Sequence, residues 1–169
     1  LPEERLRPFV HSYVQRESRL HGAEFVEPVV ARLGSILEFQ FADPYDVPLY
    51  GIEKPNPSVP ITVIGPITER RARIVIRGHV EALSVLFHPL GFHTLFGVPI
   101  SPLADLGFEG HGILGAAVSE LHERLGNTSS FLKRTQFLKS FFAIRLERLR
   151  SCDSAGMALR LLMSPERRG

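Results

Sequence analysis

The chain has 169 residues, of which 44% are hydrophobic and 22% are charged, and this length suits one domain, since typical domains contain about 100 to 200 residues. Its 20 Lys and Arg residues exceed its 18 Asp and Glu residues by a formal charge of only +2, which predicts no strong attraction to nucleic acid, because such binding needs basic residues concentrated on one face. The one cysteine, Cys152, excludes an internal disulfide and a zinc site built from several cysteines, as expected in a reducing cytoplasm.

The first half of the chain carries the pattern of short strands. Between residues 8 and 87, apolar and polar residues alternate, and Gly and Pro interrupt the runs. In the first run, Phe9, His11 and Tyr13 are expected to share one face of a strand. The segment 43–60 contains five prolines, which predicts a loop that crosses between strands.

Two further runs predict strands more sharply. Residues 36–41 predict a strand with one apolar and one polar face. The apolar face would carry Leu37, Phe39 and Phe41, and the polar face Glu38 and Gln40. Residues 72–77 alternate in the same way, and Gly78 with His79 predicts a tight turn into the run 80–87. The two runs would then form a hairpin.

Beyond these strands the period changes to three and four residues, which is typical of helices. Residues 92–96 predict a short helix that ends at Gly97. Apolar residues between 113 and 125 predict an amphipathic helix, and a longer one is expected from about 130 to 149. Strands first and helices after predict an α+β fold, in which helices pack on a small antiparallel β barrel or sandwich.

The long helix has more apolar residues than one buried stripe needs. They fall on two faces about 90° apart, and they include Phe131, Phe137, Leu138, Phe141, Phe142 and Ile144. Two faces need two partners. Either the strands cover one face and the preceding helix the other, or part of this surface is the seam of a homodimer, to which we then assign these six residues.

The sequence shows little sign of catalytic or metal chemistry. No His-x-His pair occurs among its seven histidines, and His111 and His122 are separated by about 16 Å along a helix, too far for one ion. Ser84 lacks Gly-x-Ser-x-Gly surroundings, and no phosphate-cradling loop is present. We therefore predict no enzyme, with no catalytic residues, no metal and no cofactor.

Polar residues on the strands are more suggestive of binding. Small-molecule pockets have mostly apolar walls and a few polar groups, and such groups occur among apolar neighbours at His11, Tyr13, Glu38, Gln40 and Arg73. We assign these five as candidate ligand-binding residues. The alternative is that they are the solvent-facing positions of alternating strands, because charged residues without buried partners belong outside.

Several stretches together resemble the N-terminal domain of a subset of AraC-type transcription regulators. They are residues 6–13 (LRPFVHSY), 63–68 (VIGPIT), 83–99 (LSVLFHPLGFHTLFGVP), 103–106 (LADL) and 121–125 (LHERL). The resemblance extends over about residues 6–162. The chain departs from the subset at residues 28–35 (PVVARLGS), where a Pro-Asp-Gly turn is common.

The resemblance implies a cupin-like barrel without a catalytic metal, helices that make dimer contacts, and a following domain with two helix-turn-helix motifs. On this basis residues 1–97 would form an effector-binding barrel, residues 98–152 a helical dimerisation region packed on it, and residues 153–169 the start of the DNA-binding domain. A recognition helix is missing, so DNA would be bound only through that absent domain.

The function expected from the resemblance is effector sensing and dimerisation in an AraC-family transcription regulator. The effector would be an unidentified small molecule, and the protein a cytoplasmic bacterial homodimer that does not contact a membrane, since no run of about 18 apolar residues occurs. The alternative is a stand-alone cupin-like small-molecule-binding protein or enzyme.

Overall fold

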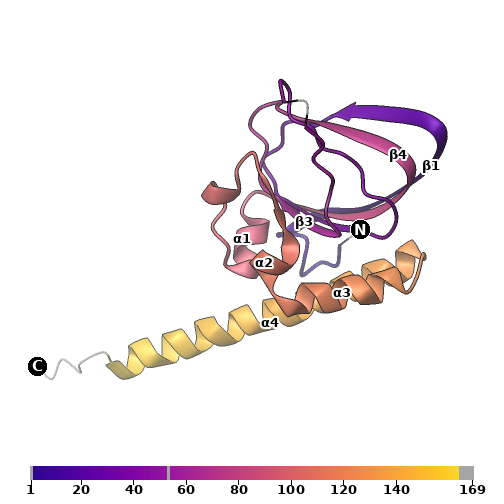
Figure 1. The fold of residues 1–169 in the computed structure, drawn as a ribbon. Coiled ribbons are helices and arrows are strands. Elements are labelled where there is room, and N and C mark those ends of the chain that lie inside the picture. Colours follow the sequence, from indigo (N-terminus) through magenta and orange to yellow (C-terminus); the bar gives the residue numbers. More distant parts are fainter. Residues whose placement is uncertain (1, 53, 164–169) are drawn as a thin grey trace, which may run out of the picture.

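The computed structural model describes residues 2–52 and 54–163, with side chains described up to Ser151. Strands come first and helices follow, as predicted (Figure 1). The strands are β1 (Val10–Pro28), β2 (Ile36–Gln40), β3 (Ile61–Ile64), β4 (Arg73–Phe87) and the short β5 (Gly107–Glu109). The helices are α1 (Gly91–Phe96), the 3-10 turn η1 (Ser101–Leu103), α2 (Gly110–Leu114), α3 (Ala116–Gly126) and α4 (Phe131–Met163).

The strands form one antiparallel sheet in the order β1-β4-β2-β3-β5. The predicted α+β class with an antiparallel sheet is therefore confirmed. The sheet is not closed into a barrel, because β1 and β5 are its two edges. Instead, the long strands β1 and β4 curl round in Figure 1 and give the sheet a concave inner face.

The curl depends on Gly78, which the sequence predicts to lie in a hairpin turn and which instead lies inside β4. Residues 73–87 form one continuous strand, so the hairpin predicted at Gly78 is wrong. Gly78 has a φ of 66°, and the register with β1 shifts between Leu20 and Glu24 beside it. A left-handed glycine in a paired strand bends the strand without ending it. The carboxylate of Asp43 accepts a hydrogen bond from the His79 backbone N–H at 3.0 Å and holds this bend.

The proline-rich segment 43–60 crosses between strands, as predicted, and lines the concave side. It pairs with the bent half of β4 through the bridges Asp46↔Val75 and Leu49↔Ala72. Tyr45 of this segment packs against Ile76 and Val80 of β4 in a small apolar cluster. The inner face is thus enclosed by the sheet on one side and by this segment on the other.

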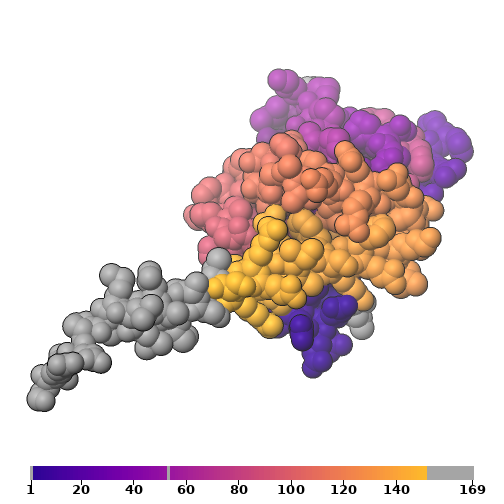
Figure 2. All heavy atoms as spheres, turned by 90° about the horizontal axis from the view of Figure 1, so that it is seen from below, coloured from indigo at the N-terminus to yellow at the C-terminus, as the bar shows by residue number. Residues whose placement is uncertain are grey.

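The main core lies on the opposite face of the sheet, where the helices pack. Because strand residues alternate between faces, Leu37 and Phe39 of β2 point to the helices, and both are completely buried, as predicted. From α4, Leu138 and Phe142 meet them in the same cluster. In Figure 1, α3 and the first part of α4 lie beneath the sheet, and Figure 2 views the molecule from that side.

The helices differ from the predicted ones at two places. The amphipathic segment 113–125 belongs to two helices, because Gly115, with a φ of 75°, separates α2 from α3. Helix α4 runs without a break to Met163, so the domain boundary predicted after residue 152 does not interrupt the backbone helix. The remaining residues of the predicted DNA-binding segment, 164–169, lie outside the described part of the chain.

Candidate functional site

Polar side chains gather on the concave face of the sheet. Glu38 and Gln40 of β2 are only 4% and 6% exposed. Glu38 is the register partner of Ser84 on β4, and cross-strand partners share a face, so the Ser84 hydroxyl lies beside the Glu38 carboxylate. The segment 43–60 adds Tyr45 and Ser58 from above. We call the five residues Glu38, Gln40, Tyr45, Ser58 and Ser84 the interior polar cluster.

Hydrogen bonds connect all five members. The Glu38 carboxylate accepts from Ser84 Oγ at 2.8 Å, from Tyr45 Oη, and from Gln40 Nε2 at 3.5 Å. Ser58 Oγ donates to Gln40 Oε1 at 2.7 Å. A buried carboxylate is costly unless donors surround it, and here each donor comes from the polar face of a strand or from the covering segment. The network accounts for how Glu38 is accommodated at this depth.

The Tyr45 hydroxyl acts as a donor in this network. Burial, and next the negative charge of Glu38 beside it, raise the pKa of Tyr45 above its ordinary value. The hydroxyl therefore keeps its proton at neutral pH and donates a hydrogen bond to the Glu38 carboxylate. Tyr45 is itself only 4% exposed, so this contact also fixes the covering segment over the sheet.

Two arginines reach the same region from different parts of the chain. Arg16 of β1 pairs with Ala82, which pairs in turn with Gln40, so Arg16 stands on the inner face. Arg32 follows β1 and bridges to Ile67. Burial lowers the pKa of the Arg32 guanidinium, and the negative charge of Glu38 opposes that shift. Arginine side chains carry a positive charge in folded proteins.

A hollow of about 190 Å³ opens next to the cluster. It is lined by Gln40, Ala42, Pro44, Ser58 and Pro60. Gln40 and Ser58 belong to the interior polar cluster, so a molecule in the hollow would touch the network at these two side chains. Its volume corresponds to about six water molecules of the liquid, which is small for a complete ligand pocket.

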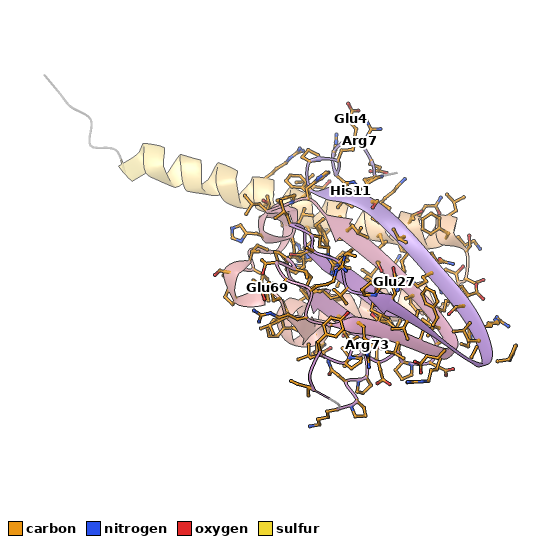
Figure 3. The ribbon with its side chains drawn as sticks, turned by 90° about the horizontal axis from the view of Figure 1, so that it is seen from above. Glu4, Arg7, His11, Glu27, Glu69 and Arg73 are labelled. Atoms are coloured by element: carbon orange, nitrogen blue, oxygen red, sulfur yellow. The ribbon has the colours of Figure 1, made fainter. Side chains whose placement is uncertain are left out.

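The structure brings together two of the five predicted binding residues, Glu38 and Gln40. Tyr13 lies on the opposite face, in the core beneath the helices. His11 is exposed near the start of β1, with its ring centroid 5.3 Å from that of His88. Arg73 is exposed at the other end of the β1–β4 ribbon, far from His11 in Figure 3.

The predicted common face of His11 and Tyr13 is wrong, for a local reason. The register with β4 shifts between Val10 and Ser12, and such a bulge inserts one residue into the alternation. Val10 and Tyr13 therefore both face the core, while His11 lies outside.

Sequence reasoning missed Arg16, Arg32, Tyr45 and Ser58, and considered Ser84 only as a nucleophile. For Ser84 a signal existed, since it is a hydroxyl inside an otherwise apolar strand. Tyr45 and Ser58 lie in the proline-rich segment, and Arg32 in a segment between strands, where no periodicity indicates which side chains point inward. Only the folded topology places them beside Glu38.

The six residues assigned to a dimer seam occupy three environments. Leu138 and Phe142 are completely buried in their own chain's core. Phe137 and Phe141 are half-buried, with the guanidinium of Arg124 4.6 Å from the Phe137 ring centroid. Phe131 and Ile144 are 44% and 52% exposed. The alternative of intrachain partners thus accounts for most of the two apolar faces, and Phe131 and Ile144 leave apolar surface uncovered.

His122 of α3 joins the helices to the strand that carries the cluster. Its Nε2 lies 2.6 Å from the Gln40 backbone carbonyl, so a protonated Nε2 donates to that oxygen. Its ring stacks against Phe39 and Phe41, with centroid separations of 6.3 and 5.4 Å. The end of β2 is therefore held by a side chain of α3.

Arg134 of α4 makes a second connection. It is 1% exposed, and its Nη1 lies 2.6 Å from the Glu81 carboxylate of β4. Its Nε donates to the Leu125 carbonyl at 3.0 Å, and its guanidinium lies 3.9 Å from the Phe41 ring centroid. Glu81 directly precedes Ala82, the register partner of Gln40. One buried cation thus joins α4, the end of α3 and the strands of the site.

Among the described residues, no group of three or more His, Cys, Asp or Glu side chains could hold a metal ion. Within the same part of the chain, none of the helices combines the length and apolar character needed to cross a membrane.

Residues 1–109 match the model of a family described as a domain of unknown function (DUF6597). The match covers more than half of the 169 residues. The chain belongs to the DUF6597 family. No curated protein matches the chain significantly. The matched residues run from the N-terminus through β5, so the interior polar cluster, Arg16 and Arg32 all lie within the DUF6597 region.

Proposed function

We propose that this DUF6597 chain is the effector-sensing and dimerisation part of an AraC-type transcription regulator, with a small-molecule site on the concave face of a cupin-like sheet. The observation that carries the proposal is the interior polar cluster. A domain that needed only stability would fill this face with apolar side chains, because buried polar networks are costly unless every member is satisfied. Here the face carries a carboxylate, an amide and three hydroxyls beside a hollow.

The proposal requires a route from the site to the helices, and two contacts could supply it. His122 contacts the Gln40 carbonyl, and Arg134 contacts Glu81. A ligand that displaced Gln40 would shift the end of β2 against α3, and with it the start of α4. A ligand changes the output only if it binds one arrangement better than the other, and these two contacts would differ between the arrangements.

The dimer part of the proposal rests on exposed apolar residues of α4. Leu132 is 67% exposed, Ile144 52% and Phe131 44%, and a contact with another molecule would cover this apolar surface. We assign that contact to a second copy of the chain, because the resemblance implies that these helices form dimers. DNA binding would belong to a domain that follows α4.

A repression assay in bacteria tests the dimer part. The chain is fused to a DNA-binding domain that represses a reporter only as a dimer. We expect repression by the fusion, and its loss in Ile144→Asp, because a buried aspartate at the seam would lack a partner. The matched control is Ile52→Asp, since Ile52 is also 52% exposed but lies in the segment 43–60.

Sedimentation of the unfused chain separates the outcomes. A folded monomer at tens of micromolar, together with no repression, would contradict the regulator hypothesis. A monomer that still bound a small molecule would instead favour the stand-alone binding protein. The unfused chain is also expected to show no sequence-specific DNA binding.

A further inference from the structure

Two buried N–H groups on the concave face have no acceptor among the residues that the structure describes. They are Nη1 of Arg16 and Nε of Arg32, and both atoms are inaccessible to solvent. A buried donor on a charged group costs more when unpaired than a neutral one does. Such an arrangement is rare in folded proteins and calls for an explanation, of which a functional role or a bound ion is one.

Both guanidiniums lie on the side of the sheet that carries the interior polar cluster. Both act electrostatically on Tyr45, and Arg32 also acts on Glu38. Arg16 lies in the register row of Gln40, two strands away across Ala82. The two arginines come from neighbouring segments of the chain, Arg16 from β1 and Arg32 from the segment after β1.

The acceptors already present do not satisfy these arginines. Both oxygens of Glu38 accept from members of the cluster. Within the described residues, neither Arg16 nor Arg32 lies within ion-pair distance of a carboxylate. Glu38 supplies one negative charge and Arg16 and Arg32 supply two positive charges. These three side chains together therefore have excess positive charge and unused hydrogen-bond donors.

We infer that the effector carries an anionic oxygen group, a carboxylate or a phosphate, which Arg16 and Arg32 bind on the concave face. The inference rests on the proposed function and names the chemistry of its ligand. A guanidinium binds a carboxylate or a phosphate well because two of its coplanar N–H groups can donate to two oxygens of the anion at once. The remainder of the ligand would extend toward the hollow at Gln40 and Ser58, whose wall is partly proline and alanine.

Calorimetric titration with matched pairs tests the charge requirement. The probes are acetate and acetamide, succinate and succinamide, phenylacetate and phenylacetamide, and inorganic phosphate, at constant ionic strength so that screening is equal. We expect at least one carboxylate, or phosphate, to bind about tenfold or more tightly than the amides. Comparison of the carboxylates with phosphate distinguishes the two anion classes.

Arginine variants then locate the site. Arg32→Gln should weaken binding of the best anion by about tenfold to a hundredfold, and Arg16→Gln by a similar factor. Arg32→Lys should retain part of the affinity, because it keeps the charge but loses the planar fork. The control is Arg73→Gln, which removes an exposed arginine from the far end of the same ribbon and should leave binding unchanged.

Three results would overturn the inference. They are equal binding of a carboxylate and its amide, undiminished binding in both glutamine variants, and binding of none of the anions. Each can occur while the repression assay still shows dimerisation, in which case the regulator proposal survives and the anion requirement fails. If Arg32→Gln does not fold, Arg16→Gln gives the same test from another strand.

Discussion

The two faces of one sheet are built in opposite ways. The face under the helices is apolar and closed, with Leu37, Phe39, Leu138 and Phe142 completely buried. The concave face carries a hydrogen-bonded carboxylate and two arginine atoms without acceptors among the described residues. Alternating residues of the same strands supply both, so β2 presents Phe39 to one side and Glu38 to the other. The apolar packing that stabilises the fold is thus concentrated on the helix side, and the concave side is free to carry polar groups.

The largest loss of stability is expected when a side chain is removed from the helix side. Phe142→Ala deletes a ring that packs edge-on against Phe87 and Phe96, at centroid distances of 5.8 and 6.1 Å. We expect the free energy of unfolding to fall by about 3 to 5 kcal/mol, because the cavity cannot collapse among neighbouring rings. Urea unfolding followed by circular dichroism measures it. A loss below about 1 kcal/mol would mean that this face is loosely packed.

The next largest effect is expected at the contact between the helices and the strands. Arg134→Leu leaves the Glu81 carboxylate, whose side chain is 16% exposed, without its partner. We expect the free energy of unfolding to fall by about 3 kcal/mol. This is the lower end of the effect seen when one partner of a buried ion pair is removed, because water can reach Glu81.

A double-mutant cycle supplies the control for this contact. Adding Glu81→Leu should recover part of the stability, since the double variant contains no unpaired charge. If the free energy lost by the double variant in urea unfolding equals the sum of the losses of the two single variants, the ion pair does not couple α4 to β4.

The smallest effect on stability is expected on the concave face. Ser84→Ala removes the hydroxyl that donates to Glu38 at 2.8 Å, while Tyr45 and Gln40 still donate to the same carboxylate. We expect a loss of about 1 kcal/mol in urea unfolding, the ordinary value for one hydrogen bond. A loss as large as that of Phe142→Ala would contradict the division of roles between the two faces.

Sequence reasoning succeeded where a signal is local. Alternation in β2 is sufficient to separate Leu37 and Phe39 from Glu38 and Gln40, and the structure confirms both faces. The short helix that ends at Gly97 was also predicted, because a left-handed glycine at a helix end is a local signal.

Predictions from the sequence were wrong or incomplete where the conformation depends on contacts with a distant part of the chain. Gly78 has the backbone conformation of a turn glycine, but pairing with β1 on both sides of it makes one bent strand. The bulge after Val10 depends on the register with β4. Arg32 becomes part of the candidate site only because Glu38 and Tyr45 fold next to it. These contacts between distant segments could not be read from the spacing of residues.

Because α4 is long and unbroken, a small rotation at its start moves its far end by a larger distance. Its 33 residues correspond to a rod of about 50 Å at 1.5 Å per residue, and in Figure 1 its far end extends beyond the sheet and the other helices. Arg134 stands near the base of that rod. Rotating the base by about 5° would displace a rod end about 50 Å away by about 4 Å. A movement too small to disturb the packing around Arg134 would thus be amplified along the helix, and anything attached to its far end would be repositioned.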